Sequence, residues 1–341
     1  MRVKNKNVRM KKLFTVLFAF SILQAMAQTT YKTVGVIERF DNSLDKIVSK
    51  DAKPEIIAEG FKWSEGPLWV QKHKMLLFSD VPDNTIYKWT PKDGKEVYLK
   101  PSGYTSSVQR GGEMGSNGLV LDKEGNLVMC QHGDRRMAKM DAPLDKPQPN
   151  FVTLASAYEG KKISSPNDAC YNSKGELFFT DPPYGLPGRN DNDPTKETKW
   201  NGVYKVKKNG EVILLIDSLS RPNGIAFFPG EKKLLVANSD PQKPNWYIYD
   251  VSGDKLTNGK IFYSDAGYDR KLQGLPDGFK IDKKGNVYAA GPGGIHFFNK
   301  DGKLLGLLKL PEATSNVALS ADEKTIFITN NKQVLRLQMR K

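Results

Sequence analysis

Cysteine and histidine are scarce in this sequence, which has two cysteines and three histidines among 341 residues. The two cysteines, Cys130 and Cys170, are too few for a disulfide framework. Their positions leave open either a single bridge or two buried free thiols. The sequence shows no histidine-cysteine cluster with metal-ligand spacing. Of the three histidines, His73 lies in the polar "QKHK" turn and His296 in the apolar "GGIHFF" run, which disfavours nucleophilic catalysis by a Ser–His or Cys–His pair.

Long apolar runs are also missing. The run "LFTVLFAFSILQ" follows the basic stretch "MRVKNKNVRMKK" and precedes "AMA". This order is typical of a secretory signal, and we expect residues 1–27 to be removed after Ala27. A transmembrane anchor is the alternative, but it needs roughly 20 apolar residues, more than this run provides. We therefore expect a periplasmic or secreted protein with no membrane anchor after cleavage, and a single mature domain over residues 28–341.

Blocks of basic residues are absent from the expected mature chain. The formal charge of +14 falls to +8 without residues 1–27, because that segment carries six Lys and Arg residues and no acid. The remaining lysines are scattered through turns such as "DKEG" and "DKKG". A chain with this distribution is not expected to bind nucleic acid.

Long helical periodicity is missing as well, and one hairpin pattern recurs in its place. Each copy has a polar first residue, alternating apolar positions, a polar turn with Gly or Asp, and a second β-rich run. The copies begin 52, 50, 56, 54 and 39 residues apart. They are "EGPLWVQKHKMLLFSD" (65–80), "NGLVLDKEGNLVMCQH" (117–132), "NDACYNSKGELFFTD" (167–181), "NGIAFFPGEKKLLVAN" (223–238), "DGFKIDKKGNVYAAG" (277–291) and "NVALSADEKTIFIT" (316–329).

Six such units predict an all-β fold, a six-bladed β-propeller with four-stranded blades. A pair of β-sandwiches is the main alternative, but it does not predict the same hairpin six times. The last hairpin is followed only by "QVLRLQM" (333–339), which can supply a third strand. We expect the fourth strand of that blade to come from the N-terminal part of the mature chain, for example "PEIIAEG" (54–60), and to close the ring.

Antiparallel pairing returns the chain to the same end of each blade after 14 or 15 residues. If the first strand of each blade lines the axis, two polar rings face one end of the central channel. The first ring contains Glu65, Asn117, Asn167, Asn223, Asp277 and Asn316. The second contains Asp80, His132, Asp181 and Asn238, with Gly291 at the corresponding place in the fifth unit.

Asn and Asp before a strand often form Asx-turns, so each residue taken alone is more simply explained as a turn former. Six polar residues that converge on one axis favour a ligand site instead. Carboxylate and amide oxygens, with no His or Cys cluster, indicate one hard divalent cation. Ca²⁺ fits this set well, and Mg²⁺, Mn²⁺ and Zn²⁺ remain alternatives.

At these positions the sequence resembles the regucalcin/gluconolactonase (senescence marker protein-like) family of six-bladed propellers. The motifs that carry the resemblance are "SEGPLW" (64–69), "SPNDA" (165–169), "RPNGIAFFPG" (221–230) and "LPDGFKID" (275–282). "CQHGDRR" and "TDPPYG" are similar to its exported bacterial branch. The resemblance implies a divalent metal held by Glu65, Asn223 and Asp277, with Asn167 as a direct or water-bridged fourth partner. It also implies lactone hydrolysis with Asp277 as proton acceptor.

Other polar residues complete the predicted site. A carboxylate beside a cation is a weak base, so Asp168 or Asp181 could accept the proton instead of Asp277. The hairpin offsets place His132, Arg135 and Tyr184 near the pocket as candidates for substrate binding, and His132 also for acid–base work. Asn117, Asn167 and Asp181 are further candidates for substrate contacts. The Gly-rich segment 102–116 could add Arg110, and the long connection 183–200 could act as a lid or binding loop.

The sequence departs from the family at two positions. The usual "NDG" is "NDA" here, with Ala169 third, and one recognition residue differs. Family members that act on sugar lactones often have Arg two residues before the Asn-Asp pair, where this chain has Ser165. We therefore expect a metal-dependent lactonase, monomeric or weakly dimeric, that turns over simple gluconolactone modestly. The alternatives are a non-catalytic propeller that binds a ligand or a protein, and a strictosidine-synthase-like or paraoxonase-like activity on the same scaffold.

Overall fold

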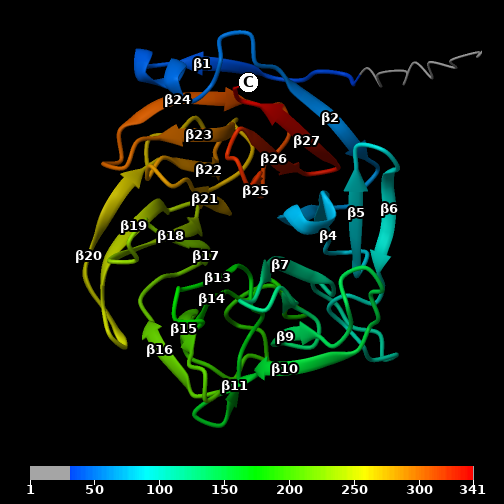
Figure 1. The fold of residues 1–341 in the computed structure, drawn as a ribbon. Helices are drawn as coiled ribbons and strands as arrows, with labels where there is room; N and C mark the ends of the chain where they lie inside the picture. Colours follow the sequence, from blue (N-terminus) through cyan, green and yellow to red (C-terminus); the bar gives the residue numbers. More distant parts are fainter. Residues whose placement is uncertain (1–30, 341) are drawn as a thin grey trace, which may run out of the picture. The chain divides into compact units, whose positions relative to one another are not determined.

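Six antiparallel sheets surround a central axis in the computed structural model, which describes residues 31–340 (Figure 1). The predicted signal segment, residues 1–27, lies outside the described residues. One strand of each sheet lies nearest the axis, and the next two strands follow outward in chain order; in two sheets the outermost strand comes from the N-terminal part of the domain. The predicted six-bladed β-propeller is therefore confirmed.

The first three blades are consecutive in the chain. Blade 1 contains β3 (Ser64–Val70), β4 (Met75–Asp80), β5 (Thr85–Thr90) and β6 (Gly94–Leu99), with the short 3-10 helix η2 (Gln71–His73) between β3 and β4. Blade 2 contains β7 (Ser116–Leu121), β8 (Leu127–Gln131), β9 (Arg136–Met140) and β10 (Phe151–Ala155). A small hairpin of β11 (Ala157–Tyr158) and β12 (Lys161–Lys162) follows. Blade 3 contains β13 (Ala169–Tyr171), β14 (Leu177–Asp181), β15 (Gly202–Val206) and β16 (Val212–Ile216).

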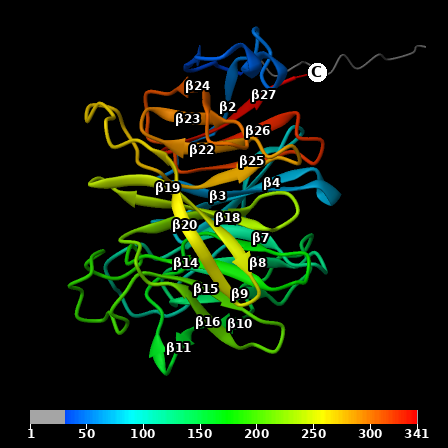
Figure 2. The same cartoon turned by 90° about the vertical axis from the view of Figure 1, so that its left-hand side faces the viewer.

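The last three blades complete the ring. Blade 4 contains β17 (Pro222–Phe227), β18 (Lys233–Asp240), β19 (Lys243–Ser252) and β20 (Lys255–Ser264). Figure 2 shows the long hairpin of β19 and β20 at its rim. Blade 5 contains β21 (Phe279–Ile281), β22 (Val287–Gly291), β23 (Gly294–Phe298) and β24 (Leu304–Lys309). Blade 6 contains β25 (Asn316–Leu319), β26 (Thr325–Asn330), β27 (Gln333–Gln338) and β2 (Pro54–Glu59).

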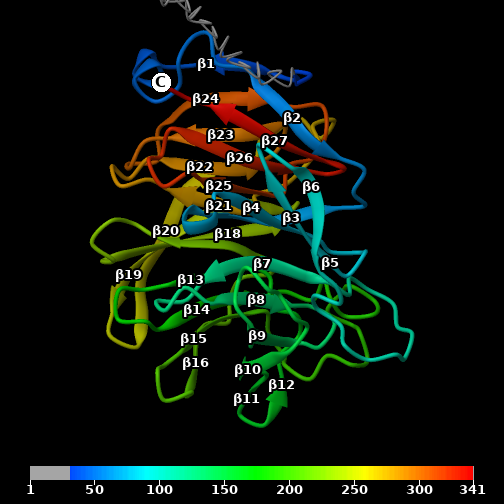
Figure 3. The same ribbon diagram turned by 45° about the vertical axis from the view of Figure 1, so that its right-hand side comes forward.

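The strand β2 closes the ring, as predicted from the sequence for residues 54–60. It pairs antiparallel with β27, so residues from both ends of the domain share blade 6 (Figure 3). The Arg336 guanidinium donates to the Glu55 carboxylate across this pair, at 2.9 and 2.6 Å. An unexpected strand, β1 (Val36–Arg39), pairs with β24 and gives blade 5 a fifth strand. The 3-10 helix η1 (Asn42–Lys46) follows it.

The hydrophobic core lies between neighbouring blades. Side chains alternate between the two faces of a strand, so each blade presents an apolar face to the blade on either side. Between blades 1 and 2, for example, Leu77 packs in one cluster with Leu119 and Met129, and all three are at most 3% exposed. Cys130 lies on β8, the second strand of blade 2, and Cys170 lies on β13, the inner strand of blade 3; both are free thiols. Among residues 31–340, no helix combines the length and hydropathy that crossing a bilayer requires.

Candidate active site

A cavity of about 400 Å³ opens at one end of the central channel. Five of the six residues predicted for the first polar ring line it: Glu65, Asn117, Asn167, Asn223 and Asp277. Its other walls come from the connecting loops and strand ends: Trp63, Glu113, Tyr184, Ser239, Gln273, Gly274, Leu275, Ala313 and Thr314. The inner strands of different blades therefore bring carboxylates and amides from distant parts of the chain to one place.

Glycines on the inner strands allow this convergence. In four blades a glycine directly follows the polar residue, and a Cβ there would lie less than 3 Å from the polar residue of the next blade. The close approaches are Gly66 to Asn117, Gly118 to Asn167 and Asp168, Gly224 to Asp277, and Gly278 to Asn316. Any larger residue would push neighbouring blades apart at the axis. The repeated pattern of a polar residue followed by Gly is thus a packing requirement that positions the site.

Glu65 and Asp277 are the two carboxylates of the predicted metal set. Their Oε2 and Oδ1 atoms accept hydrogen bonds from the backbone N–H of the following glycine, at 3.1 and 3.0 Å. Neither forms an ion pair with Lys or Arg within residues 31–340. Burial, followed by the negative charge of Asp277, raises the pKa of Glu65 well above its ordinary value. Burial, followed by the charges of Asp168 and Glu113, does the same to the pKa of Asp277.

Two amide oxygens that line the cavity are left without partners. Asn117 Oδ1 and Asn223 Oδ1 are buried and accept no hydrogen bond in the described part of the chain. The amide nitrogen of Asn223 donates to Ser239 Oγ at 3.2 Å, so the amide oxygen of Asn223 points away from Ser239. A buried acceptor without a donor costs free energy. Two such oxygens in one cavity therefore indicate that a bound ion, water molecule or ligand interacts with them.

This donor set fits a hard divalent cation. No three His, Cys, Asp or Glu side chains of residues 31–340 gather into a metal-binding cluster. The predicted set, however, has only two carboxylates, and amide oxygens supply the rest. Two carboxylates and two or three neutral oxygens are ligands that Ca²⁺ and Mg²⁺ accept. A cation placed among them would also relieve the repulsion that raises the pKa values of Glu65 and Asp277.

Asn316 and Asp168 lie outside the cavity lining, although both were expected in the pocket. Asn316 donates through Nδ2 to Asp168 Oδ2 at 3.2 Å, and Lys280 Nζ lies 3.8 Å from the same oxygen. The other oxygen of Asp168 accepts from the Ala169 backbone N–H at 2.8 Å. Asp168 is 2% exposed. Its carboxylate is thus occupied by protein groups beside the channel axis.

The predicted second polar ring does not face the cavity, which corrects the sequence-based placement of Asp181. Asp181 accepts hydrogen bonds from the backbone N–H groups of Ser164 and Ser165, at 2.8 and 2.6 Å. Asp80 and Asn238 bind the loops that enter their own blades in the same way. These side chains satisfy backbone donors that strand pairing leaves free. Burial, partly offset by these two backbone donors, raises the pKa of Asp181 to about 6.

His132 is displaced from this pattern by one residue. In blade 2 it is Gln131 that pairs with Ser116, as Asp80 pairs with Ser64 in blade 1. A shift of one residue along a strand reverses the direction of the side chain. His132 is fully buried and is not a lining residue, but its Nδ1 lies 3.2 Å from Oε2 of Glu113, which does line the cavity.

Arg135 and Arg110 bind backbone carbonyls and do not line the cavity. The guanidinium of Arg135 donates to Ile163 O and Thr195 O at 2.8 and 2.9 Å, so the sequence-based placement of Arg135 at the substrate is corrected. Arg110 donates to the carbonyls of Gly133 and Gly185 and thereby ties its loop to two others. A buried guanidinium with five donors is well suited to joining loops in this way.

Tyr184 lines the cavity as expected. Burial, followed by the charge of Asp277, raises the pKa of its hydroxyl, so the hydroxyl remains a neutral donor. Ser165, at the position where an arginine was considered, is fully buried and donates to Pro182 O at 2.6 Å. Its Oγ also accepts from the Gly185 backbone N–H at 2.8 Å. Ser165 therefore holds the segment that carries Tyr184.

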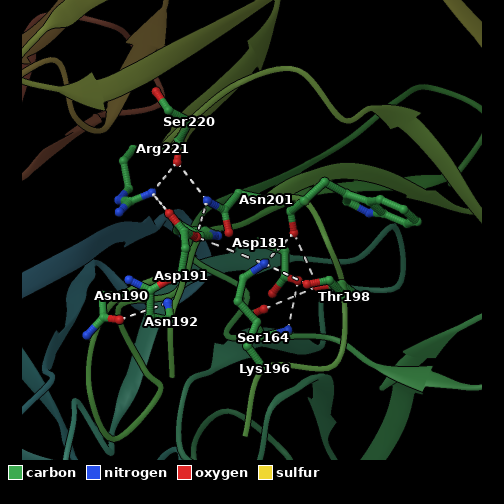
Figure 4. A network of polar contacts seen from close by, with 12 residues as sticks. Ser164, Asp181, Asn190, Asp191, Asn192, Lys196, Thr198, Asn201, Ser220 and Arg221 are labelled. Atoms are coloured by element: carbon green, nitrogen blue, oxygen red, sulfur yellow. Dashed lines mark hydrogen bonds and ion pairs between the residues drawn. The ribbon is translucent and has the colours of Figure 1, made fainter. Parts of the chain in front are cut away.

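The connection 183–200 is anchored by polar contacts rather than left free. Figure 4 shows Asp191 between the Arg221 guanidinium and the Asn201 amide, at 2.5 and 2.8 Å. Lys196 donates to Thr198 O and Trp200 O at 2.8 and 2.9 Å within the same loop. These contacts fix the loop against the entry to blade 4, and of this connection Tyr184 alone lines the cavity.

Several lining residues were not identified from the sequence. Glu113 was overlooked although it lies four residues before Asn117, in the Gly-rich segment where Arg110 was considered. Trp63, Ser239, Gln273 and Thr314 also come from loops or strand ends. Sequence offers one signal for them, because each lies within four residues of a predicted polar position or at the end of its hairpin.

Comparison with known proteins agrees with this geometry. The model of the SMP-30/gluconolactonase/LRE-like region matches residues 63–332. The chain belongs to this family. A gluconolactonase of Zymomonas mobilis is 38% identical over 313 residues, which cover 90% of this chain and 86% of that protein. A regucalcin of Xenopus laevis is 24% identical, with coverage of 81% and 85%.

Solved structures of the SMP-30/gluconolactonase family superimpose closely. A gluconolactonase from Xanthomonas campestris aligns with a TM-score of 0.78 at 25% identity, covering 93% of this chain and 99% of that one. A regucalcin from Agrobacterium tumefaciens shares the fold, with a TM-score of 0.64 at 16% identity. Together with the 38% identity over most of the chain, the gluconolactonase structure identifies an enzyme of the lactonase type.

Proposed function

We propose that this protein is a divalent-metal-dependent hydrolase that opens a small lactone, a sugar-acid lactone or a related cyclic ester. The observation that carries the proposal is the convergence of two buried carboxylates and two unpartnered amide oxygens on one cavity. A non-catalytic binding propeller has no need of such a set. The named function of the gluconolactonase relatives supports the reaction class.

Glu65, Asn223 and Asp277 would hold the cation, with Asn167 as a direct or water-bridged partner. A bound divalent cation polarises the lactone carbonyl and stabilises the negative charge that develops on its oxygen. Ca²⁺ is our first choice because the ligands are all oxygen atoms and include neutral amides. The regucalcin relatives support a divalent cation.

The remaining cavity walls would position the substrate. Trp63 and Leu275 provide an apolar surface against which the carbon skeleton of a lactone can pack. The neutral hydroxyl of Tyr184 can donate to a ring or hydroxyl oxygen of the substrate. A cavity of about 400 Å³ accommodates a monosaccharide-sized lactone with room for an attacking water.

We also propose that the enzyme acts in the periplasm or outside the cell as a monomer or weak dimer. The support for export is the basic, apolar and small-residue order of residues 1–27. Cell fractionation tests the localisation. Sedimentation of the mature protein tests its oligomeric state.

The experiment for the function is a panel of lactones assayed after chelation. We expect chelator-treated protein to lose hydrolysis above the spontaneous rate, and Ca²⁺, Mg²⁺, Mn²⁺ or Zn²⁺ added singly to restore it to different extents. Elemental analysis of the chelated sample serves as the control. Full hydrolysis by a demonstrably metal-free sample would contradict the metal dependence, and no hydrolysis with any cation would contradict the lactonase itself.

A further inference from the structure

Glu113 provides a third carboxylate in the cavity, and the divalent cation does not need it for charge balance. It lies on the Gly-rich loop before β7, and its side chain is 17% exposed. The loop is held in place by Arg110, which donates to Gly133 O and Gly185 O. Gly112 packs so closely on Leu186 that a Cβ there would lie 2.3 Å from the Leu186 carbonyl oxygen.

His132 lies directly behind Glu113. The imidazole is fully buried, its Nδ1 is 3.2 Å from Glu113 Oε2, and neither ring nitrogen makes a hydrogen bond among residues 31–340. Two backbone bonds join the segments that carry them: His132 N–H donates to Gly115 O, and Gly133 N–H donates to Met114 O, both at 3.2 Å. The only other ion-pair partner of Glu113 in the described chain is Arg189, which is 52% exposed and 3.6 Å away. Such an exposed ion pair contributes little.

The other carboxylates near the channel are committed elsewhere. Glu65 and Asp277 form the proposed cation site, and a carboxylate that binds a cation is a weak base. Asp168 is occupied by Asn316 and the Ala169 N–H, and Asp181 by the N–H groups of two serines. Among the carboxylates that line the cavity, Glu113 alone lies outside the proposed cation site, and neither of its oxygens accepts a backbone hydrogen bond in the described residues.

We infer that Glu113 is the catalytic proton carrier of the lactonase and that His132 is its positioning residue. This inference rests on the proposed lactonase function. In the first step the oxygen of a water molecule bonds to the lactone carbonyl carbon, and the Glu113 carboxylate takes the proton from that water. In the second step the bond between the carbonyl carbon and the ring oxygen breaks. The alkoxide formed takes the proton from Glu113, which regenerates the carboxylate and releases the hydroxy acid.

The direct test replaces Glu113 by Gln, which keeps the size of the side chain and removes its basicity. We expect Glu113→Gln to lower kcat at least about 100-fold, the usual contribution of general acid–base catalysis, with KM and cation affinity close to those of the wild type. Glu124→Gln is the matched control, because Glu124 lies in the turn at the opposite end of the same hairpin. A raised KM with unchanged kcat would show that Glu113 binds substrate instead, and would overturn the inference.

A second pair of variants tests His132 and guards against a folding defect. We expect His132→Ala to lower kcat without weakening cation binding, and His132→Asn to restore most of the rate, because the Asn amide nitrogen occupies the place of Nδ1. We also expect formate to rescue Glu113→Ala in a concentration-dependent manner. Failure of both rescues in folded variants would overturn the inference. If the wild type itself opens no lactone, the proposed function fails together with this inference; activity retained in Glu113→Gln contradicts the inference alone.

Discussion

Asp168 of blade 3 and Asn316 of blade 6 are joined across the central channel by a hydrogen bond of 3.2 Å. The two blades lie opposite each other in the ring (Figure 1), so this bond spans the axis. Lys280, from blade 5, lies 3.8 Å from the same carboxylate oxygen and donates to Phe279 O at 3.1 Å. Asp168 therefore links three blades beneath the cavity, a structural task for a residue that the sequence offered as a catalytic candidate.

The stability of the ring should depend on this link. We expect Asp168→Ala to lower the free energy of unfolding by about 2 to 4 kcal/mol, because it leaves buried partners of a charged group unsatisfied. Asp168→Asn keeps an acceptor oxygen and should cost much less. Urea denaturation of both variants measures the difference. Equal, small losses in the two would show that the link across the channel is unimportant.

The cation prediction concerns the charge of Asp277. Asp277→Asn removes one of two carboxylates and preserves the shape, so cation affinity should fall at least about tenfold while the fold is kept. Calorimetric titration with Ca²⁺ measures the affinity, and circular dichroism checks the fold. Asp301→Asn, in an exposed turn of the same blade, is the control. Unchanged affinity in Asp277→Asn would exclude Asp277 as a ligand.

The close approach of neighbouring blades at the axial glycines leads to a prediction about stability and cation binding. A Cβ at Gly224 would lie 2.5 Å from the Asp277 carbonyl oxygen and 2.9 Å from Gly278 Cα. We expect Gly224→Ala to separate blades 4 and 5, to cost about 1 to 3 kcal/mol of stability, and to weaken cation binding. Gly267→Ala should do neither, since no atom lies within 4 Å of a Cβ there. Wild-type cation affinity in Gly224→Ala would disprove this role for the close approach.

The raised pKa of Asp181 should make the stability of the protein depend on pH. Its pKa is about 6 in the folded protein and has an ordinary value of 3.8, because burial outweighs the backbone donors Ser164 and Ser165 and the charges of Arg135 and Lys196. A raised folded pKa means that folding favours the protonated acid. The stabilising contribution is present below about pH 4 and is lost as the pH rises through about 6, amounting to roughly 3 kcal/mol.

The measurement compares wild type with Asp181→Asn, which cannot ionise. The difference in the free energy of unfolding between the two should favour the wild type most near pH 4 and decline towards pH 7. Other acids titrate equally in both proteins and cancel in the difference. A difference that stays constant with pH would place the folded pKa of Asp181 near its ordinary value.

Local pattern determined the hairpins, the number of blades and the closing strand. Period-2 alternation and polar turns act within about 15 residues, so the first two strands of every blade, the third strand of the last blade and the closing role of β2 could be predicted from the sequence. The same pattern predicted that Glu65, Asn117, Asn167, Asn223 and Asp277 would converge, because the first strand of every blade must lie near the axis.

Tertiary packing decided the remaining side chains. His132 follows by one residue the position of Gln131, which corresponds to Asp80, and that shift turns its side chain towards Glu113 behind the cavity wall. Glu113 and Tyr184 come from loops whose course is set by contacts with other loops, which no local periodicity encodes. Asp181 and Arg135 are residue types that often bind ligands, but in this structure both side chains form hydrogen bonds with backbone groups. The alternation of residues along a strand determines to which face a side chain points. The groups that the side chain contacts there belong to segments far away in the sequence.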